Sequence, residues 1–270
     1  MRQGNGEHGS GKSPGQRAAL PRRFYQTVTT ERIEPAAAPS QQRSPGYRVL
    51  LDGKAVRTPA KGHLIVPTPD LAAAIAGEWQ AQREHIDPDS MPLTRLTNSA
   101  IDGVVGRQGE VAADIVKYLG SDLVCYRAAD PSELVRRQAE AWDPVLEWCH
   151  AVLGIKLTVT TGILPVAQPE AAGAALAQWL QGLDAFQLAA AHAMTTLLGS
   201  AVLTVAHAKG RLACWDAWAA AHIDEDFQAE KWGHDSLAEA RRDRQWQQMQ
   251  AASRLFALSG EPDETLTVCR

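Results

Sequence analysis

The spacing of apolar residues in the second half of the chain limits the fold more than any other feature of this sequence. From Pro131 onward, large side chains recur every three or four residues, as at Leu134, Trp142 and Val145. That period places them on one face of an α-helix. Pro144 is expected to kink or divide the first helix of this series. Further helices are predicted over residues 169–183, 184–207, 212–230 and 236–258.

The first half of the chain has β-prone segments instead. A threonine-rich segment, residues 27–30, predicts a first strand. Residues 47–51 and 54–58 flank the pair Asp-Gly at residues 52–53, which indicates a tight hairpin because a type I′ turn needs positive φ at both central residues. The apolar run at residues 64–66 predicts a further strand. This part of the chain is therefore expected to form an antiparallel sheet.

A helix is predicted to follow the sheet. Residues 68–70, Thr-Pro-Asp, combine a capping hydroxyl, a proline whose missing N–H costs nothing there, and an acid at the positive end of the helix dipole. Leu71, Ile75 and Trp79 follow four residues apart and should form one apolar face against the sheet. Glu78, beside that face, is expected to be solvated.

These patterns predict an α+β chain with two folded units. The N-terminal unit is a small antiparallel sheet with helices, and the C-terminal unit is an α-helical bundle. The expected divisions are a disordered tail at residues 1–22, the mixed α/β domain at 23–129, the bundle at 130–258 and a C-terminal tail at 259–270.

Composition and charge exclude several classes of function. No apolar run approaches the roughly 20 residues that a membrane-spanning helix needs. The net charge is −4 and no long basic run occurs, so neither nucleic acid nor a membrane is expected as a partner. The four cysteines form no C-x-x-C pair, and the first twenty residues contain no apolar signal segment. A protein or a small molecule is therefore the expected partner, and the cysteine pattern fits a reducing compartment.

One phosphate-loop pattern, G-x-x-x-x-G-K-S, occurs at residues 6–13. A working phosphate loop leaves a buried strand and enters a helix, so that backbone N–H groups converge on the phosphate. Only five residues precede this match and Pro14-Gly15 follows it, so neither element can form. No cofactor is therefore expected, although a nucleotide-dependent enzyme of unknown class stays open as the alternative.

Other catalytic or metal-binding patterns are weak. His222, Asp226 and Glu230 are four residues apart and would share one helix face, a spacing that could ligate a metal. An exposed polar face has the same spacing, and no H-E-x-x-H pair or G-x-S-x-G elbow occurs. We therefore expect no metal site and no catalytic residue.

The segment around residue 227 is more informative, because it joins three consecutive acids to two large aromatic side chains. That combination suits a recognition surface. An acidic helix start with Trp232 packed inward remains the alternative. Trp215 and Trp246 are expected to be mainly packing residues, although one or two tryptophans could be exposed as anchors. The candidate partner-binding residues are Asp224, Glu225, Asp226, Phe227, Glu230 and Trp232.

Taken together, the chain resembles the family of F-type ATP synthase assembly chaperones that serve the alpha subunit. The resemblance extends from Arg23 to about Leu258 and depends on ordered segments rich in uncommon residues. They include Arg23-Phe24-Tyr25, Leu51-Asp52-Gly53-Lys54, Thr58-Pro59, Glu78-Trp79, Met91-Pro92-Leu93-Thr94-Arg95-Leu96, Ala100-Ile101-Asp102, Cys125-Tyr126-Arg127, Trp142-Asp143-Pro144, Gly199-Ser200, Asp224-Glu225, Phe227-Gln228 and Trp232-Gly233.

The resemblance implies a mixed α/β domain followed by an orthogonal helical bundle without catalytic activity. It also implies that the chain binds the free alpha subunit of F1-ATPase and shields its interface until the beta subunit replaces it. Because such a surface must be vacated, we expect a monomer. The short Gly-rich segment before Arg23 has no amphipathic face of the kind found in transit peptides, so a bacterial cytoplasm is favoured over the mitochondrial matrix.

Overall fold

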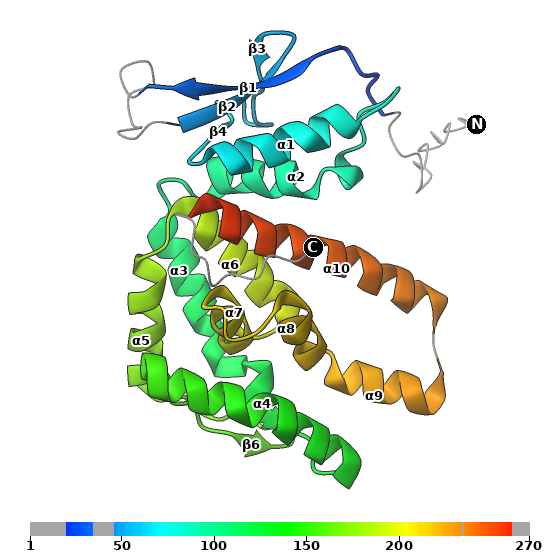
Figure 1. Cartoon of the computed structure of the whole chain (residues 1–270). Coiled ribbons are helices and arrows are strands. Elements are labelled where there is room, and N and C mark those ends of the chain that lie inside the picture. The colour runs from blue at the N-terminus through cyan, green and yellow to red at the C-terminus, as the bar shows by residue number, and fades with distance from the viewer. Residues whose placement is uncertain (1–19, 35–45, 234, 261–270) are drawn as a thin grey trace, which may run out of the picture.

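The computed structural model describes residues 20–34, 46–233 and 235–260. It shows a small antiparallel sheet covered by helices at one end, followed by a helical bundle (Figure 1). The α+β fold that the sequence predicts is therefore confirmed. The phosphate-loop pattern at residues 6–13 and most of both predicted tails lie outside the described residues.

The sheet is centred on its second strand, which pairs antiparallel with each of the other three. Asp52 and Gly53 have φ values of 47° and 76°, as the predicted hairpin turn requires. The Asp52 carboxylate also accepts hydrogen bonds from the backbone amides of Gln26 and Thr27, which lowers its pKa. The strands are β1 (Val28–Ile33), β2 (Gly46–Leu51), β3 (Lys54–Ala55) and β4 (Ile65–Val66).

Helix α1 (Pro69–Ala81) covers the sheet as predicted. The Thr68 hydroxyl caps it by accepting a hydrogen bond of 3.2 Å from the amide of Leu71. Leu71 and Ile75 are fully buried, and the α1 face contacts β1 and β2. The Thr68 hydroxyl also donates to the carbonyl of Leu258, which joins the start of α1 to the last helix of the chain.

Glu78 on α1 has a structural role that the sequence does not indicate. Its carboxylate accepts hydrogen bonds of 2.8 and 2.7 Å from the amides of Leu93 and Thr94 at the start of α2 (Pro92–Ser99). The Thr94 hydroxyl donates to it as well, at 2.6 Å. The prediction of a solvated Glu78 is wrong, because this carboxylate supplies the N-terminal cap that Met91 cannot provide.

After α2 the chain enters the bundle. Helix α6 is central to it, since most of its length is buried and both α3 and α10 pack along it. Helix α10 also packs against α2, and so connects the bundle to the N-terminal sheet and its helices (Figure 1). Helix α3 lies before the expected domain boundary at residue 130 but packs on α5 and α6. The bundle helices are α3 (Gln108–Lys117), α4 (Ser132–Leu153), α5 (Glu170–Gln181), α6 (Ala185–Leu198), α7 (Ala201–Ala208), α8 (Cys214–Ala221), α9 (Ile223–Trp232) and α10 (Ser236–Ser259).

Two predicted helices are divided in the structure. The predicted helix at 184–207 breaks at Gly199, which has a φ of 62°, and the Ser200 side chain then caps α7. The helix predicted at 212–230 divides at His222, between α8 and α9. Conversely, α4 continues through Pro144 without division.

Short elements connect the helices. A π-helical turn follows α2 directly, and β5 pairs in parallel with β6 to form a second, two-stranded sheet. No helix in the described ranges combines the length and the apolar content that crossing a membrane requires. These elements are η2 (Pro88–Ser90), η3 (Ala100–Val104), η4 (Tyr118–Ser121), η5 (Leu123–Cys125), β5 (Tyr126–Arg127) and β6 (Thr160–Thr161).

Candidate functional site

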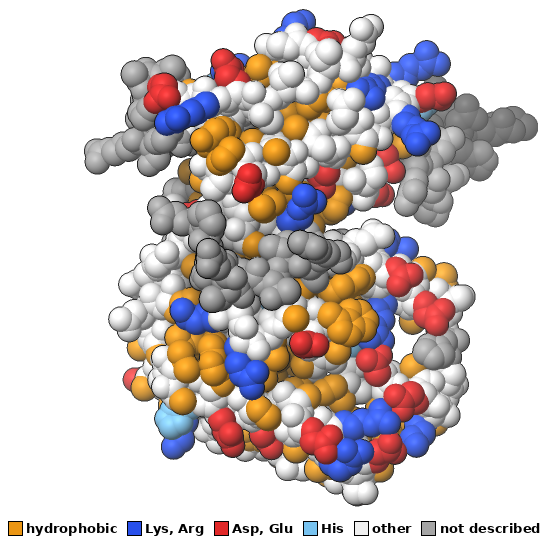
Figure 2. Space-filling model, in the orientation of Figure 1, with side chains coloured by type: hydrophobic (Ala, Val, Ile, Leu, Met, Phe, Trp, Pro, Cys, Tyr) orange, Lys and Arg blue, Asp and Glu red, His pale blue; other side chains and the backbone are white. Residues whose placement is uncertain are grey.

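A hollow of about 770 Å³ separates α9 from the first half of α10. Figure 2 shows it as the opening on the right of the lower part of the molecule. Glu225, Gln228 and Trp232 line it from α9, and Leu237 and Arg241 line it from α10. The candidate binding segment therefore forms one wall of a concave surface.

Two large apolar side chains that line this hollow are exposed to solvent. Trp232 is 79% exposed and Leu237 is 78% exposed. Glu225 is exposed as well. The hydrogen bond from Arg242 to Asp226 is the main cause that raises the pKa of the Arg242 guanidinium, and the charge of Glu225 adds to it. The alternative in which Trp232 packs inward is wrong, since a side chain so exposed contributes contact area only to a partner.

Phe227, from the same helix, is by contrast buried. It is 4% exposed and is the one buried side chain among the α9 residues. The Arg137 guanidinium lies 5.3 Å from its ring centroid and the Lys231 ammonium lies 5.2 Å from it. Phe227 thus anchors α9 to the bundle and is not available to a partner in this conformation.

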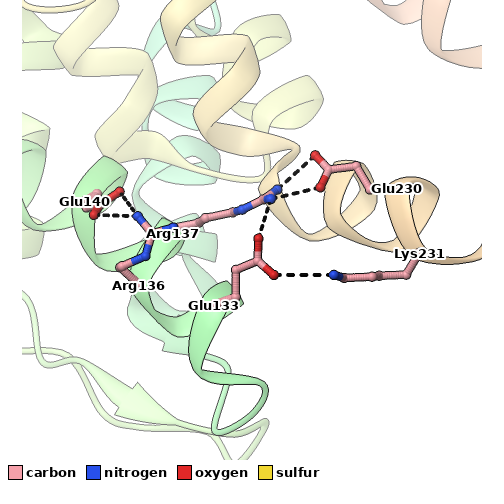
Figure 3. A network of polar contacts seen from close by, with 6 residues as sticks. All are labelled: Glu133, Arg136, Arg137, Glu140, Glu230 and Lys231. Carbon is pink, nitrogen blue, oxygen red and sulfur yellow. Dashed lines mark hydrogen bonds and ion pairs between the residues drawn. The ribbon is translucent and has the colours of Figure 1, made fainter.

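A network of ion pairs fixes α9 against α4 (Figure 3). The Arg137 guanidinium lies 2.7 Å from a carboxylate oxygen of Glu133 and 2.9 Å from one of Glu230, while Lys231 lies 3.4 Å from Glu133. Hydrogen bonds from Arg137 lower the pKa of both carboxyl groups. Arg136 and Glu140 form a separate pair farther along α4. Because these groups are largely exposed, the network orients α9 more than it stabilises the fold.

The remaining acids of the candidate segment also hold α9 in place. Asp224 accepts a hydrogen bond of 2.6 Å from the side-chain amide of the buried Gln138. Asp226 forms an ion pair with Arg242 of α10. Of the six predicted residues, Asp224, Asp226 and Glu230 thus engage neighbouring helices of this chain. Glu225 and Trp232 are the two that face the hollow.

The three side chains whose spacing could ligate a metal, His222, Asp226 and Glu230, do not converge on one point. His222 is buried, its Nδ1 lies 2.7 Å from the carbonyl oxygen of Trp218, and its ring packs 3.8 Å from the Trp218 ring. Asp226 and Glu230 each pair with an arginine on a different helix. Within the described residues, no group of three potential ligands is placed to hold a metal ion.

Sequence reasoning missed one wall of the hollow. Leu237 has no large apolar residue three or four positions away in the chain, so it cannot belong to a buried helix face. This isolation in the sequence could have indicated that Leu237 is exposed. Trp215, expected to pack, is 57% exposed and meets Trp246 edge to face at 5.1 Å. Trp215 does not line the hollow.

Three comparisons relate this chain to known proteins. A family model described as "ATP12 chaperone protein" matches residues 22–150. The mitochondrial protein atp12 of Schizosaccharomyces pombe is 25% identical over a matched stretch of 201 residues, and the match covers 68% of this chain and 68% of that protein. A crystal structure of Atp12 from Paracoccus denitrificans is 42% identical, covers 89% of this chain and 99% of its own, and has a TM-score of 0.81. A putative chaperone from Agrobacterium tumefaciens is 43% identical, covers 88% and 86% respectively, and has a TM-score of 0.82.

Proposed function

We propose that this chain, which belongs to the ATP12 chaperone family, assists assembly of the F1 sector of ATP synthase by holding the free alpha subunit. The observation that carries the proposal is the pair Trp232 and Leu237, both more than three-quarters exposed at the hollow between α9 and α10. Two large apolar side chains exposed in one hollow are typical of a surface that a partner covers.

The chemistry of the hollow fits an unassembled subunit. Before assembly, a subunit of an oligomer exposes an apolar interface that is prone to aggregation. Trp232 and Leu237 supply apolar contact, and the exposed carboxylate of Glu225 favours a partner with a basic group beside the apolar area. A holding chaperone must release its client, so we propose that the complex is reversible and that the beta subunit replaces the chaperone.

The ion pairs around Arg137 support such a holding role. They fix α9 before a partner arrives, so little order has to be created on binding. We infer a non-enzymatic protein that needs no cofactor. We further propose that it is monomeric in the free state and acts in a bacterial cytoplasm, in keeping with its similarity to chains from Paracoccus and Agrobacterium.

Binding of purified alpha subunit to three variants tests the proposal. Trp232→Ala and Glu225→Lys should each weaken binding by about tenfold or more, as expected for an anchor or a reversed charge at an interface. Trp215→Ala is the matched control, because Trp215 is an exposed tryptophan outside the hollow. Binding that is unchanged in the first two variants, or weakened equally in all three, contradicts the assignment of this surface.

A further inference from the structure

A second hollow adjoins the one between α9 and α10. A cavity of about 350 Å³ lies between α2, α6 and α10, and Leu197 of α6 lines both hollows. Leu96 of α2 and Ala193 of α6 are apolar residues that line this second hollow. The two hollows therefore meet at Leu197 and both lie along α10, one at its exposed start and the other nearer the centre of the molecule, and together we call them the α10 groove.

A single face of α10 forms one side of this groove. Ala238, Arg241 and Gln245 line the first hollow, and Gln248 and Ala251 line the second. Their spacings of three and four residues place them on one stripe of the helix. Over the 13 intervals from Ala238 to Ala251, a rise of 1.5 Å per residue gives a groove about 20 Å long.

The opposite side also consists of helix stripes. Glu225, Gln228 and Trp232 repeat at three and four residues along α9, and Ala193 and Leu197 do so along α6. Small side chains recur among the lining residues, at Ala193, Ala229, Ala238 and Ala251. Such residues allow a further helix to approach to the 8–10 Å that helix packing requires.

We propose that this groove binds one amphipathic helix of the alpha subunit, about 13 residues long. Glu225 and Arg241 line the groove from opposite walls, and neither forms an ion pair with another described residue. A helix with a basic residue on one flank and an acidic residue on the other would pair both, while its small apolar face covers Trp232 and Leu237. The inference rests on the proposed function and specifies which structure of the client is held.

Substitutions that fill the groove test whether its whole length is used. Ala238→Trp fills the first hollow and Gln248→Trp fills the second, at side chains that are exposed in the free protein. Ala240→Trp is the matched control, since Ala240 is an exposed alanine of α10 that lines neither hollow. We expect both filled variants to bind alpha subunit about tenfold or more weakly, equivalent to about 1.4 kcal/mol, with unchanged thermal melting.

The outcomes separate this inference from the proposed function. Full binding by Gln248→Trp alongside weak binding by Ala238→Trp overturns the 20 Å helix and leaves the chaperone role intact. Equal binding by all three variants overturns the groove as the binding site. If the unaltered chain does not bind alpha subunit at all, the proposed function fails and this inference fails with it.

Photo-crosslinking determines the conformation of the bound segment. Crosslinking residues at positions 238 and 248 of the full chain are ten residues apart on α10, or about 15 Å. If the client segment is helical, the two crosslinked positions should lie about ten residues apart in the alpha subunit. Positions only four or five residues apart indicate an extended strand, and crosslinks to a second copy of this chain indicate self-association. Either result overturns the proposal.

Discussion

Phe227 and Trp232 lie on the same short helix, and the structure predicts opposite effects of removing them. Phe227 is 4% exposed and packs between Arg137 and Lys231, whereas Trp232 is 79% exposed. Phe227→Ala leaves a cavity under α9, while Trp232→Ala removes a side chain that few atoms of this chain contact. The comparison therefore tests whether α9 is oriented as the structure has it.

The expected loss of stability follows from burial. Truncation of a buried phenylalanine to alanine costs about 3–5 kcal/mol. Phe227 lies outside the continuous cluster that forms the main core, so the lower end, about 3 kcal/mol, is expected. For a chain of this size, each kcal/mol corresponds to about 2–4 °C in Tm, which gives a decrease of about 6–12 °C. Trp232→Ala should change the free energy of unfolding by less than about 0.5 kcal/mol.

Thermal melting followed by circular dichroism measures both variants under the same conditions. We expect a large decrease in Tm for Phe227→Ala and almost none for Trp232→Ala. Similar shifts in the two variants, or a larger one for Trp232→Ala, would refute the placement of Phe227 inward and Trp232 outward.

Three further substitutions have defined outcomes. Burial raises the pKa of Asp122 to about 6, so the folded protein binds this proton more tightly than the unfolded chain does. The free energy of unfolding of the parent, measured by urea titration relative to Asp122→Asn, should therefore fall by up to about 3 kcal/mol between pH 4 and pH 7. A difference that rises with pH contradicts this. Glu78→Gln removes the charged cap of α2 and should cost about 1 kcal/mol in the same titrations, whereas no loss would show that the cap is dispensable. Trp142→Phe removes the 2.7 Å hydrogen bond to the Ala220 carbonyl and should lower the free energy of unfolding by about 2 kcal/mol, measured by chemical unfolding with circular dichroism. A loss below about 0.5 kcal/mol would show that the carbonyl finds another donor.

Local signals predicted the N-terminal sheet well. The turn at Asp52 and Gly53 and the cap at Thr68 depend on backbone geometry within a few residues, which the sequence encodes directly. The prediction of one helix over 184–207 was wrong at Gly199, where the backbone is left-handed and the helix ends. The apolar pattern continues on both sides of this glycine, so the spacing of apolar residues does not reveal the break.

The orientation of the candidate residues could not be predicted in the same way. Whether Phe227 or Trp232 faces the bundle depends on Arg137, which is about ninety residues earlier in the chain. The capping role of Glu78 likewise depends on where α2 begins relative to α1. Such contacts between distant segments have no local pattern, so the sequence indicated the segment that forms the site but not the two residues that face the hollow.

Displacement of the chaperone by the beta subunit tests the central claim most directly. Isolated alpha subunit would be mixed with this chain, and its aggregation would be measured by light scattering. Beta subunit would then be added, and the complexes present would be separated by size-exclusion chromatography. We expect that alpha subunit stays soluble in a complex with this chain and that beta subunit releases the chain as the two F1 subunits associate. Aggregation of alpha subunit regardless of this chain, or a complex that beta subunit does not displace, would contradict it.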